Sequence, residues 1–146
     1  MKNKAHGDKL FFSMTRDFLD VYLPTQVGKS PHTAKAYRDA LTIFRRYLYE
    51  QLHLSIAKFR FVDCTREMVL DFLVFLEQNG NAPGTCNQRL TAIKAYVWYA
   101  SDDDISLQPT ALSISRVPPR RSQKKVKPVL SEDDLATVLL QPKNNL

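Results

Sequence analysis

Two stretches of the chain carry polar side chains at a spacing that suits contact with nucleic acid. In segment 31–52, polar residues recur at i, i+3, i+7 and i+10, namely Lys35, Arg38, Thr42 and Arg45. Alone, such a stripe indicates only a solvated helix face. Segment 85–100 adds hydroxyl, amide and cationic side chains outside its apolar positions, namely Thr85, Asn87, Gln88, Arg89, Thr91 and Lys94. Hydroxyls and helix N-termini hold phosphates, and Asn, Gln and Arg reach base edges, so the two stretches together favour a duplex DNA surface.

Two alanines are part of the same prediction of a duplex DNA surface. Ala92 and Ala95 lie between the polar positions of segment 85–100, and we expect them on its outer surface. A thin surface there would let the helix backbone approach DNA closely.

The charge of the chain is concentrated in one segment. Lys and Arg number 21 against 15 acids, which gives a formal net charge of +6 and a pI near 9.4. Between positions 116 and 127 there are six cations and no acid: Arg116, Arg120, Arg121, Lys124, Lys125 and Lys127. A basic stretch of this kind favours a polyanionic partner.

The residue types that support catalysis or metal binding are poorly placed in this chain. The three histidines lack ligand spacing, and the six tyrosines all fall in segments expected to be helical core. Cys64 and Cys86 are too few for a disulfide framework or a zinc cluster, so we expect both to pack in a reducing, cytoplasmic compartment. The sequence predicts no catalysis by this chain, no cofactor, no metal and no small-molecule ligand.

Periodicity predicts four helices, a short fifth and no strand. The first covers about 10–23 and is expected to stop at Pro24, and the second starts with Ser30 as N-cap and Pro31 at its first position. The third runs from the cap Thr65 to Gly80 and is apolar nearly all round over 69–76, which predicts a central position. Thr85 is expected to cap the fourth helix, and a short fifth follows Pro109.

The last part of the chain has a different character. The stretch 117–128 is rich in proline and basic residues and reads as an extended linker, and Ser131 and Asp134 then begin another amphipathic helix. We therefore expect a flexible N-terminus at 1–9, a helical domain at 10–113, a basic linker at 114–129 and the start of a truncated domain at 130–146. Apolar runs are short and mean hydropathy is −0.32, so no membrane partner is expected.

Four degenerate patterns follow one another along the chain. They are Ser30-x-x-Thr33-x-x-x-Tyr37-x-x-x-Leu41-x-x-Phe44, Thr85-x-Asn87-x-Arg89-Leu90-x-Ala92-Ile93-Lys94-x-Tyr96-x-x-Tyr99-Ala100, Ile105-x-x-Gln108-Pro109 and Lys127-Pro128-x-Leu130-Ser131-x-Asp133-Asp134. In this order and with these gaps they resemble the SAM-like core-binding domain of tyrosine recombinases, the phage and transposon integrases, over about residues 10–140. Thr91 stands where serine is usual and Lys94 where arginine is usual, and both keep the chemistry. Gln108 departs from the usual asparagine.

The resemblance implies an all-α, four- to five-helix SAM-like bundle, followed by a basic linker and the first helix of an absent catalytic domain. Such domains clamp double-stranded DNA together with the catalytic domain, and two of their helices cross in the major groove. Carried over to this sequence, the DNA-binding residues are Ser30, Thr33, Lys35, Arg38, Thr85, Asn87, Gln88, Arg89, Lys94, Arg120, Arg121, Lys124 and Lys125. The family's catalytic arginines, lysine, histidines and tyrosine belong to the second domain.

The resemblance therefore implies the DNA-binding N-terminal portion of a site-specific tyrosine recombinase or integrase. Two alternatives stay open at this point. One is a helical interaction module that contacts other recombinase protomers. The other is a small helical regulator whose basic tail binds nucleic acid, in which case loss of residues 115–128 would abolish all binding and changes at Asn87 or Gln88 would do nothing.

Overall fold

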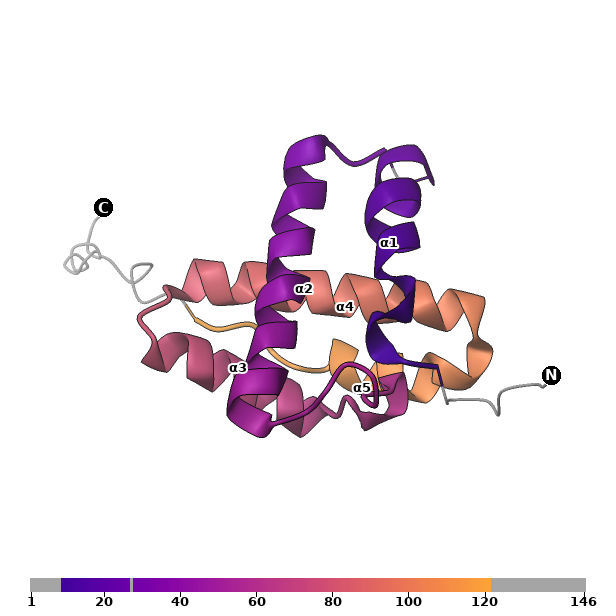
Figure 1. The fold of residues 1–146 in the computed structure, drawn as a ribbon. Helices are drawn as coiled ribbons and strands as arrows, with labels where there is room; N and C mark the ends of the chain where they lie inside the picture. The colour runs from indigo at the N-terminus through magenta and orange to yellow at the C-terminus, as the bar shows by residue number, and fades with distance from the viewer. Residues whose placement is uncertain (1–8, 27, 122–146) are drawn as a thin grey trace, which may run out of the picture. The chain divides into compact units, whose positions relative to one another are not determined.

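The computed structural model describes residues 9–26 and 28–121, and its elements there are helical (Figure 1). They are η1 (Phe11–Met14), α1 (Thr15–Asp17), η2 (Phe18–Gln26), α2 (Pro31–Leu52), η3 (Phe61–Asp63), α3 (Arg66–Gln78), α4 (Pro83–Asp103), η4 (Ile105–Leu107) and α5 (Gln108–Ser115). No strand occurs in the described ranges, and one isolated antiparallel bridge joins Leu10 to Arg60. The prediction of an all-α bundle is confirmed. The helix expected near 131 lies outside the described residues.

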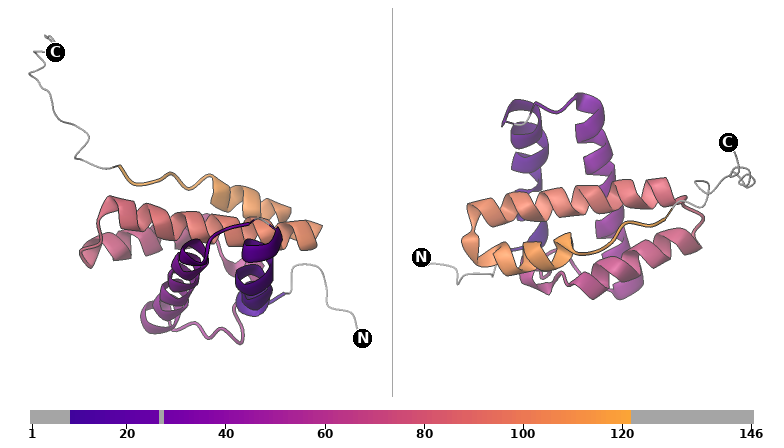
Figure 2. Two further views of the ribbon diagram at one scale, coloured as in Figure 1. Left: turned by 90° about the horizontal axis from the view of Figure 1, so that it is seen from above. Right: turned by 180° about the vertical axis from the view of Figure 1, so that it is seen from behind.

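The chain divides into two compact units. The first comprises Met1–Asn81 and Thr85–Pro119, and the second comprises Ala82–Gly84 and Arg120–Leu146. Within the first unit, the helical segment 11–26 lies beside α2, and both cross the layer that contains α3, α4 and α5 (Figures 1 and 2).

The prediction that Pro24 stops the first helix is wrong. Pro24 lies inside η2, which is a π-helix and runs on to Gln26. Proline breaks an α-helix because its ring clashes with the carbonyl four residues back, whereas a π-helix bonds each carbonyl to the residue five positions on. The helical segment ends farther along the chain, in a turn where the Lys29 N–H donates to the Leu23 carbonyl at 2.8 Å and Gly28 takes a φ of +71°. A left-handed residue at this place is a common helix ending that favours glycine.

The predicted caps of the next two helices are confirmed. The Ser30 hydroxyl accepts a hydrogen bond from the Thr33 N–H at 3.3 Å, and Thr65 accepts from the Met68 N–H at 3.2 Å. The prediction that Thr85 caps the fourth helix is wrong, because α4 begins two residues earlier, at Pro83. Proline suits the first turn of a helix, where its missing N–H has no intrahelical partner.

The central helix of the bundle is α4 rather than α3. Val74 on α3 is 40% exposed, so α3 buries one face only, through Val69, Phe72, Leu73 and Leu76. On α4, Ala92 and Ile93 are both fully buried, although they point in different directions around the helix. The expectation that Ala92 lies on the outer surface is therefore wrong, since neighbouring elements cover that side of α4.

Tyr96 on α4 holds the N-terminal turn against the bundle. Its ring is fully buried and lies 5.3 Å, centre to centre, from the rings of both Phe11 and Phe18. Its hydroxyl donates to the Phe11 carbonyl and accepts a hydrogen bond from the Met14 N–H, the latter at 3.1 Å. Burial raises the pKa of the Tyr96 hydroxyl, so this group stays protonated and able to donate.

The other tyrosines differ in their exposure. Tyr47 is buried, and Tyr22, Tyr37 and Tyr99 pack against the core while partly exposed. Tyr49 is 67% exposed, so its assignment to the core is wrong. Within residues 9–26 and 28–121, no element covers α2 at position 49 enough to bury this ring. Both cysteines are free and buried, which confirms that they pack.

We expect Tyr96→Phe to destabilise the protein by about 1–3 kcal/mol, because the part-buried Met14 N–H and the buried Phe11 carbonyl both lose the hydrogen bond to the Tyr96 hydroxyl. Urea denaturation would measure this loss. Tyr99→Phe is the matched control, since the Tyr99 hydroxyl bonds the exposed Asp17 carboxylate and its loss should cost less. Equal losses for the two variants would contradict the role assigned to Tyr96.

Candidate nucleic-acid interface

The predicted residues at the start of α2 lie at its capped amino end. Ser30 is exposed and Thr33 is half-buried, and their hydroxyl oxygens are 3.4 Å apart. These two positions and Tyr37 follow one face of the helix, at i, i+3 and i+7. A helix N-terminus carries partial positive charge and unpaired N–H groups, so this end of α2 suits a phosphate.

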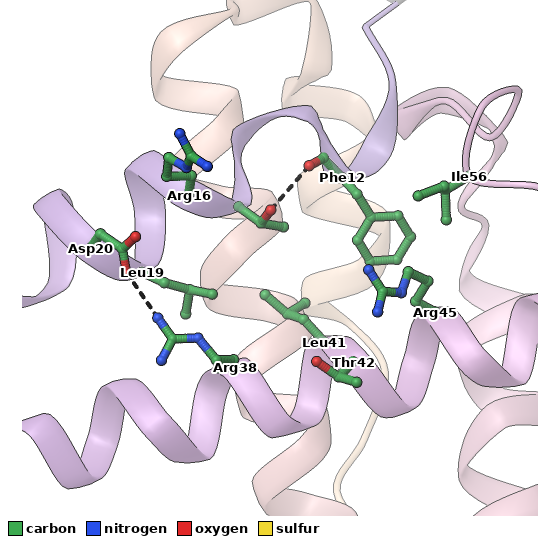
Figure 3. A pocket seen from close by; sticks show the side chains of 10 residues that line it. Phe12, Arg16, Leu19, Asp20, Arg38, Leu41, Thr42, Arg45 and Ile56 are labelled. Atoms are coloured by element: carbon green, nitrogen blue, oxygen red, sulfur yellow. Dashed lines mark hydrogen bonds and ion pairs between the residues drawn. The ribbon is translucent and has the colours of Figure 1, made fainter.

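The two predicted cations of α2 are already engaged with carboxylates. Lys35 Nζ lies 3.0 Å from Asp39 Oδ2, one turn along the same helix. Arg38 Nη2 donates to Asp20 Oδ1 of η2 at 2.8 Å, across the gap between the two segments (Figure 3). Both pairs are solvent-exposed, and exposed pairs contribute little to stability, so either cation is able to exchange its carboxylate for a phosphate at small cost.

On α4, four of the exposed residues form one continuous stripe with a half-buried alanine between them. Gln88, Thr91, Trp98 and Asp102 are exposed and Ala95 is half-buried, at i, i+3, i+10, i+14 and i+7. The predicted residues Thr85, Asn87 and Arg89 are half-buried, and Arg89 is turned about 160° from Thr91 of the stripe around an α-helix. Arg89 and Lys94 are five positions apart, which turns their side chains about 140° from one another around an α-helix. The structure therefore does not bring these two cations to the same face.

Lys94 is bound to the end of the bundle. Its ammonium group donates to the Val117 carbonyl at 2.7 Å, and burial lowers the pKa of the Lys94 side chain. Val117 is 1% exposed and Ile114 is fully buried, so the core includes residues beyond the expected domain end at 113. Lys94 thus ties α4 to the segment that leaves α5.

Of the predicted linker cations, two lie in the described part of the chain. Arg120 and Arg121 follow Pro119 and belong to the second unit. Lys124 and Lys125 lie outside the described residues.

A shallow hollow of about 160 Å³ joins the α4 stripe to the amino end of α2. Its lining includes Ala95 and Trp98 of α4, Tyr37 of α2 and Lys29, which precedes the α2 cap. Trp98 is 50% exposed, and neither it nor Lys29 was among the predicted site residues. The spacing of Trp98 from Gln88 and Thr91, outside the apolar arc of α4, is the sequence signal that marks it as a surface residue.

Within residues 9–26 and 28–121, no group of three or more His, Cys, Asp or Glu side chains is arranged to hold a metal ion. None of the helices in these ranges combines the length and the apolar character that crossing a bilayer requires.

The contact between Lys94 and Val117 is testable by proteolysis. We expect Lys94→Ala to increase the rate of cleavage between Arg116 and Val117 by an Arg-specific protease about fivefold, because a charged hydrogen bond of roughly 1 kcal/mol is lost. Cleavage after Arg66, at the start of α3, reports any global opening in the same sample.

Lys35→Ala is the matched control, since this exposed lysine pairs only within its own helix. If Lys94→Ala and Lys35→Ala are cleaved at Arg116 at the same rate as the unchanged protein, Lys94 does not hold this segment.

Comparisons with known proteins agree with this arrangement of helices. The family model described as the phage integrase SAM-like domain matches residues 10–111, which are 102 of the 146 residues. Comparison with curated proteins and comparison with solved structures gave no match. The matched range begins at the bridge residue Leu10 and ends within α5, so it covers the helical bundle. The chain belongs to the phage integrase SAM-like family, the N-terminal domain of tyrosine recombinases.

Proposed function

We propose that the bundle binds duplex DNA during site-specific integration or recombination, with α2 and α4 at the major groove. The observation that carries this proposal is the exposed stripe of α4, which starts at Gln88 and Thr91 and reaches the hollow beside the amino end of α2. Amide and hydroxyl side chains at the start of the stripe suit base edges, and the capped end of α2 suits a phosphate. In Figures 1 and 2, α2 and α4 cross one another at a steep angle.

The individual residues have different roles in this proposal. Four residues contact the DNA backbone, namely Lys29, Ser30, Thr33 and Thr85. Three residues approach the base edges, namely Asn87, Gln88 and Thr91. Lys35 and Arg38 exchange their carboxylates for phosphates. Lys94 acts indirectly, because it holds the point from which the chain continues to the basic residues Arg120, Arg121, Lys124 and Lys125. These linker cations follow the DNA backbone, and strand cleavage belongs to a catalytic domain outside the matched residues.

We expect Gln88→Glu/Thr91→Glu to weaken binding to a random duplex about tenfold or more, because two carboxylates would face the DNA. Fluorescence anisotropy with a labelled duplex measures this affinity. The matched control is Gln51→Glu/Gln78→Glu, which adds the same charge at exposed positions at the ends of α2 and α3. Equal weakening by both variants would mean that only net charge matters.

A second arm separates the bundle from the linker. Replacing Arg120, Arg121, Lys124 and Lys125 with Gln should reduce the salt dependence of log K by up to about 3.6, since each duplex phosphate contact contributes about 0.9. If this variant loses all binding while the α4 variant loses none, the linker is the whole interaction and the bundle does not bind DNA.

Contact between protomers is a second candidate function. Ile105 in η4 is 74% exposed and Leu112 on α5 is 48% exposed, so both apolar side chains are accessible to a protein partner. Sedimentation velocity on DNA-bound protein is the test. Ile105→Ser/Leu112→Ser should abolish any higher-order complex and leave the affinity of a single molecule for DNA unchanged. If the complexes persist, this surface is not the contact.

A further inference from the structure

A groove separate from the proposed duplex surface lies between the N-terminal helical segment and α2 (Figure 3). Its volume is about 300 Å³, and the residues that line it all fall within 12–20 and 38–56, so α4 takes no part in it. The two walls carry three arginines, Arg16 from α1 and Arg38 and Arg45 from α2.

The groove has an excess of positive charge. Three arginines face one acid, Asp20, which leaves a formal charge of +2 (three minus one). Asp20 pairs with Arg38 at 2.8 Å. Within residues 9–26 and 28–121, neither Arg16 nor Arg45 forms an ion pair or a side-chain hydrogen bond. Two guanidinium groups without carboxylate partners, on opposite walls of a concave site, suit an anion that accepts paired hydrogen bonds, as phosphate does.

The floor and the continuation of the groove indicate the size of the ligand. Leu19 and Leu41 are buried and lie between the two walls, so the part of the groove between the helical segments is apolar (Figure 3). Beyond Arg45 and Ile56, a second hollow continues along α2 and is lined by Arg46, Tyr49 and Ser55. Arginines therefore recur along a path that is longer than one phosphate ion.

Tyr49 indicates which polyanion fits this path. Its ring is 67% exposed beside Arg45 and Arg46, and an exposed aromatic ring beside cations is the arrangement on which unpaired bases stack. The carboxylate side chains of an acidic peptide offer no flat apolar face that would cover this ring. A duplex buries its bases, so its backbone would reach the arginines and leave the ring uncovered.

We infer that this groove is a second nucleic-acid site, which binds a single strand through phosphates at Arg16 and Arg45 and a base at Tyr49. The site shares no residue with the α4 stripe. Of the α2 residues given a role in the proposed duplex contact it includes Arg38, whose guanidinium group is paired with Asp20, and of the polar α2 stripe it also includes Thr42 and Arg45. The inference therefore does not depend on the proposed duplex contact.

The test uses the full chain and a fluorescently labelled oligothymidine. Arg16→Gln/Arg45→Gln should weaken binding about tenfold and reduce the salt dependence of log K by about 1.4, because each single-strand phosphate contact contributes about 0.7. The matched control is Lys58→Gln/Arg66→Gln, which removes the same charge from exposed residues that do not line the groove and should have a smaller effect. Circular dichroism checks that both variants remain folded.

Two further arms identify the ligand and separate this site from the duplex surface. Tyr49→Ala should weaken oligothymidine binding and leave duplex binding unchanged, and Gln88→Glu/Thr91→Glu should do the reverse. Inorganic phosphate should compete with oligothymidine no better than chloride at equal ionic strength. Equal loss in the groove variant and its charge-matched control would overturn the site. An unchanged affinity in Tyr49→Ala would overturn the assignment to a single strand, and displacement by phosphate alone would reduce the site to a simple anion site.

Discussion

The position of α4 depends on one buried hydroxyl. Tyr96 lies at the centre of the aromatic core, and its hydroxyl satisfies both a carbonyl and an N–H of the N-terminal turn. A buried polar group without a partner is costly, so this hydroxyl and the turn at Phe11–Met14 require each other. The turn is also joined to the segment before α3, where the Phe11 N–H donates to the Phe59 carbonyl at 2.8 Å and Phe61 N–H donates to the Lys9 carbonyl at 3.1 Å.

This arrangement decides which sides of α4 meet solvent. Neighbouring elements cover much of α4, and along the middle of the helix the exposed side chains lie on the stripe from Gln88 to Asp102. Ala92, which a helical pattern alone leaves undecided, becomes core. Lys94 is turned to the end of the bundle, where its ammonium group finds the Val117 carbonyl. The surface of α4 is thus narrower than its polar residues indicate, and it includes Trp98.

The same packing creates a concave surface on the N-terminal segment. Pro24 does not end this segment, so η2 extends beside α2 and contacts it. The packing of η2 against α2 brings Asp20, which precedes Pro24, to Arg38, and the cations Arg16 and Arg45 line the same groove. Neither the groove nor its excess charge is visible in residues 12–20 or in residues 38–56 taken separately. The charge emerges only when two segments that each look solvated are placed side by side.

Local rules determined the helices and several of their ends. The Ser30-Pro31 start and the Thr65 cap are set by hydrogen bonds within three residues, and the family resemblance rests on patterns of the same range. Contacts between residues far apart in the sequence decided which of the other side chains are buried and which partners they have. Position 92 differs from position 95 only because another element covers it, Lys94 meets a carbonyl 23 residues away, and Tyr49 lacks a neighbour that would bury it. The sequence specifies where each side chain lies around its own helix. Tertiary packing fixes which other elements contact each side of that helix, because the burial of a side chain depends on all the elements packed around it.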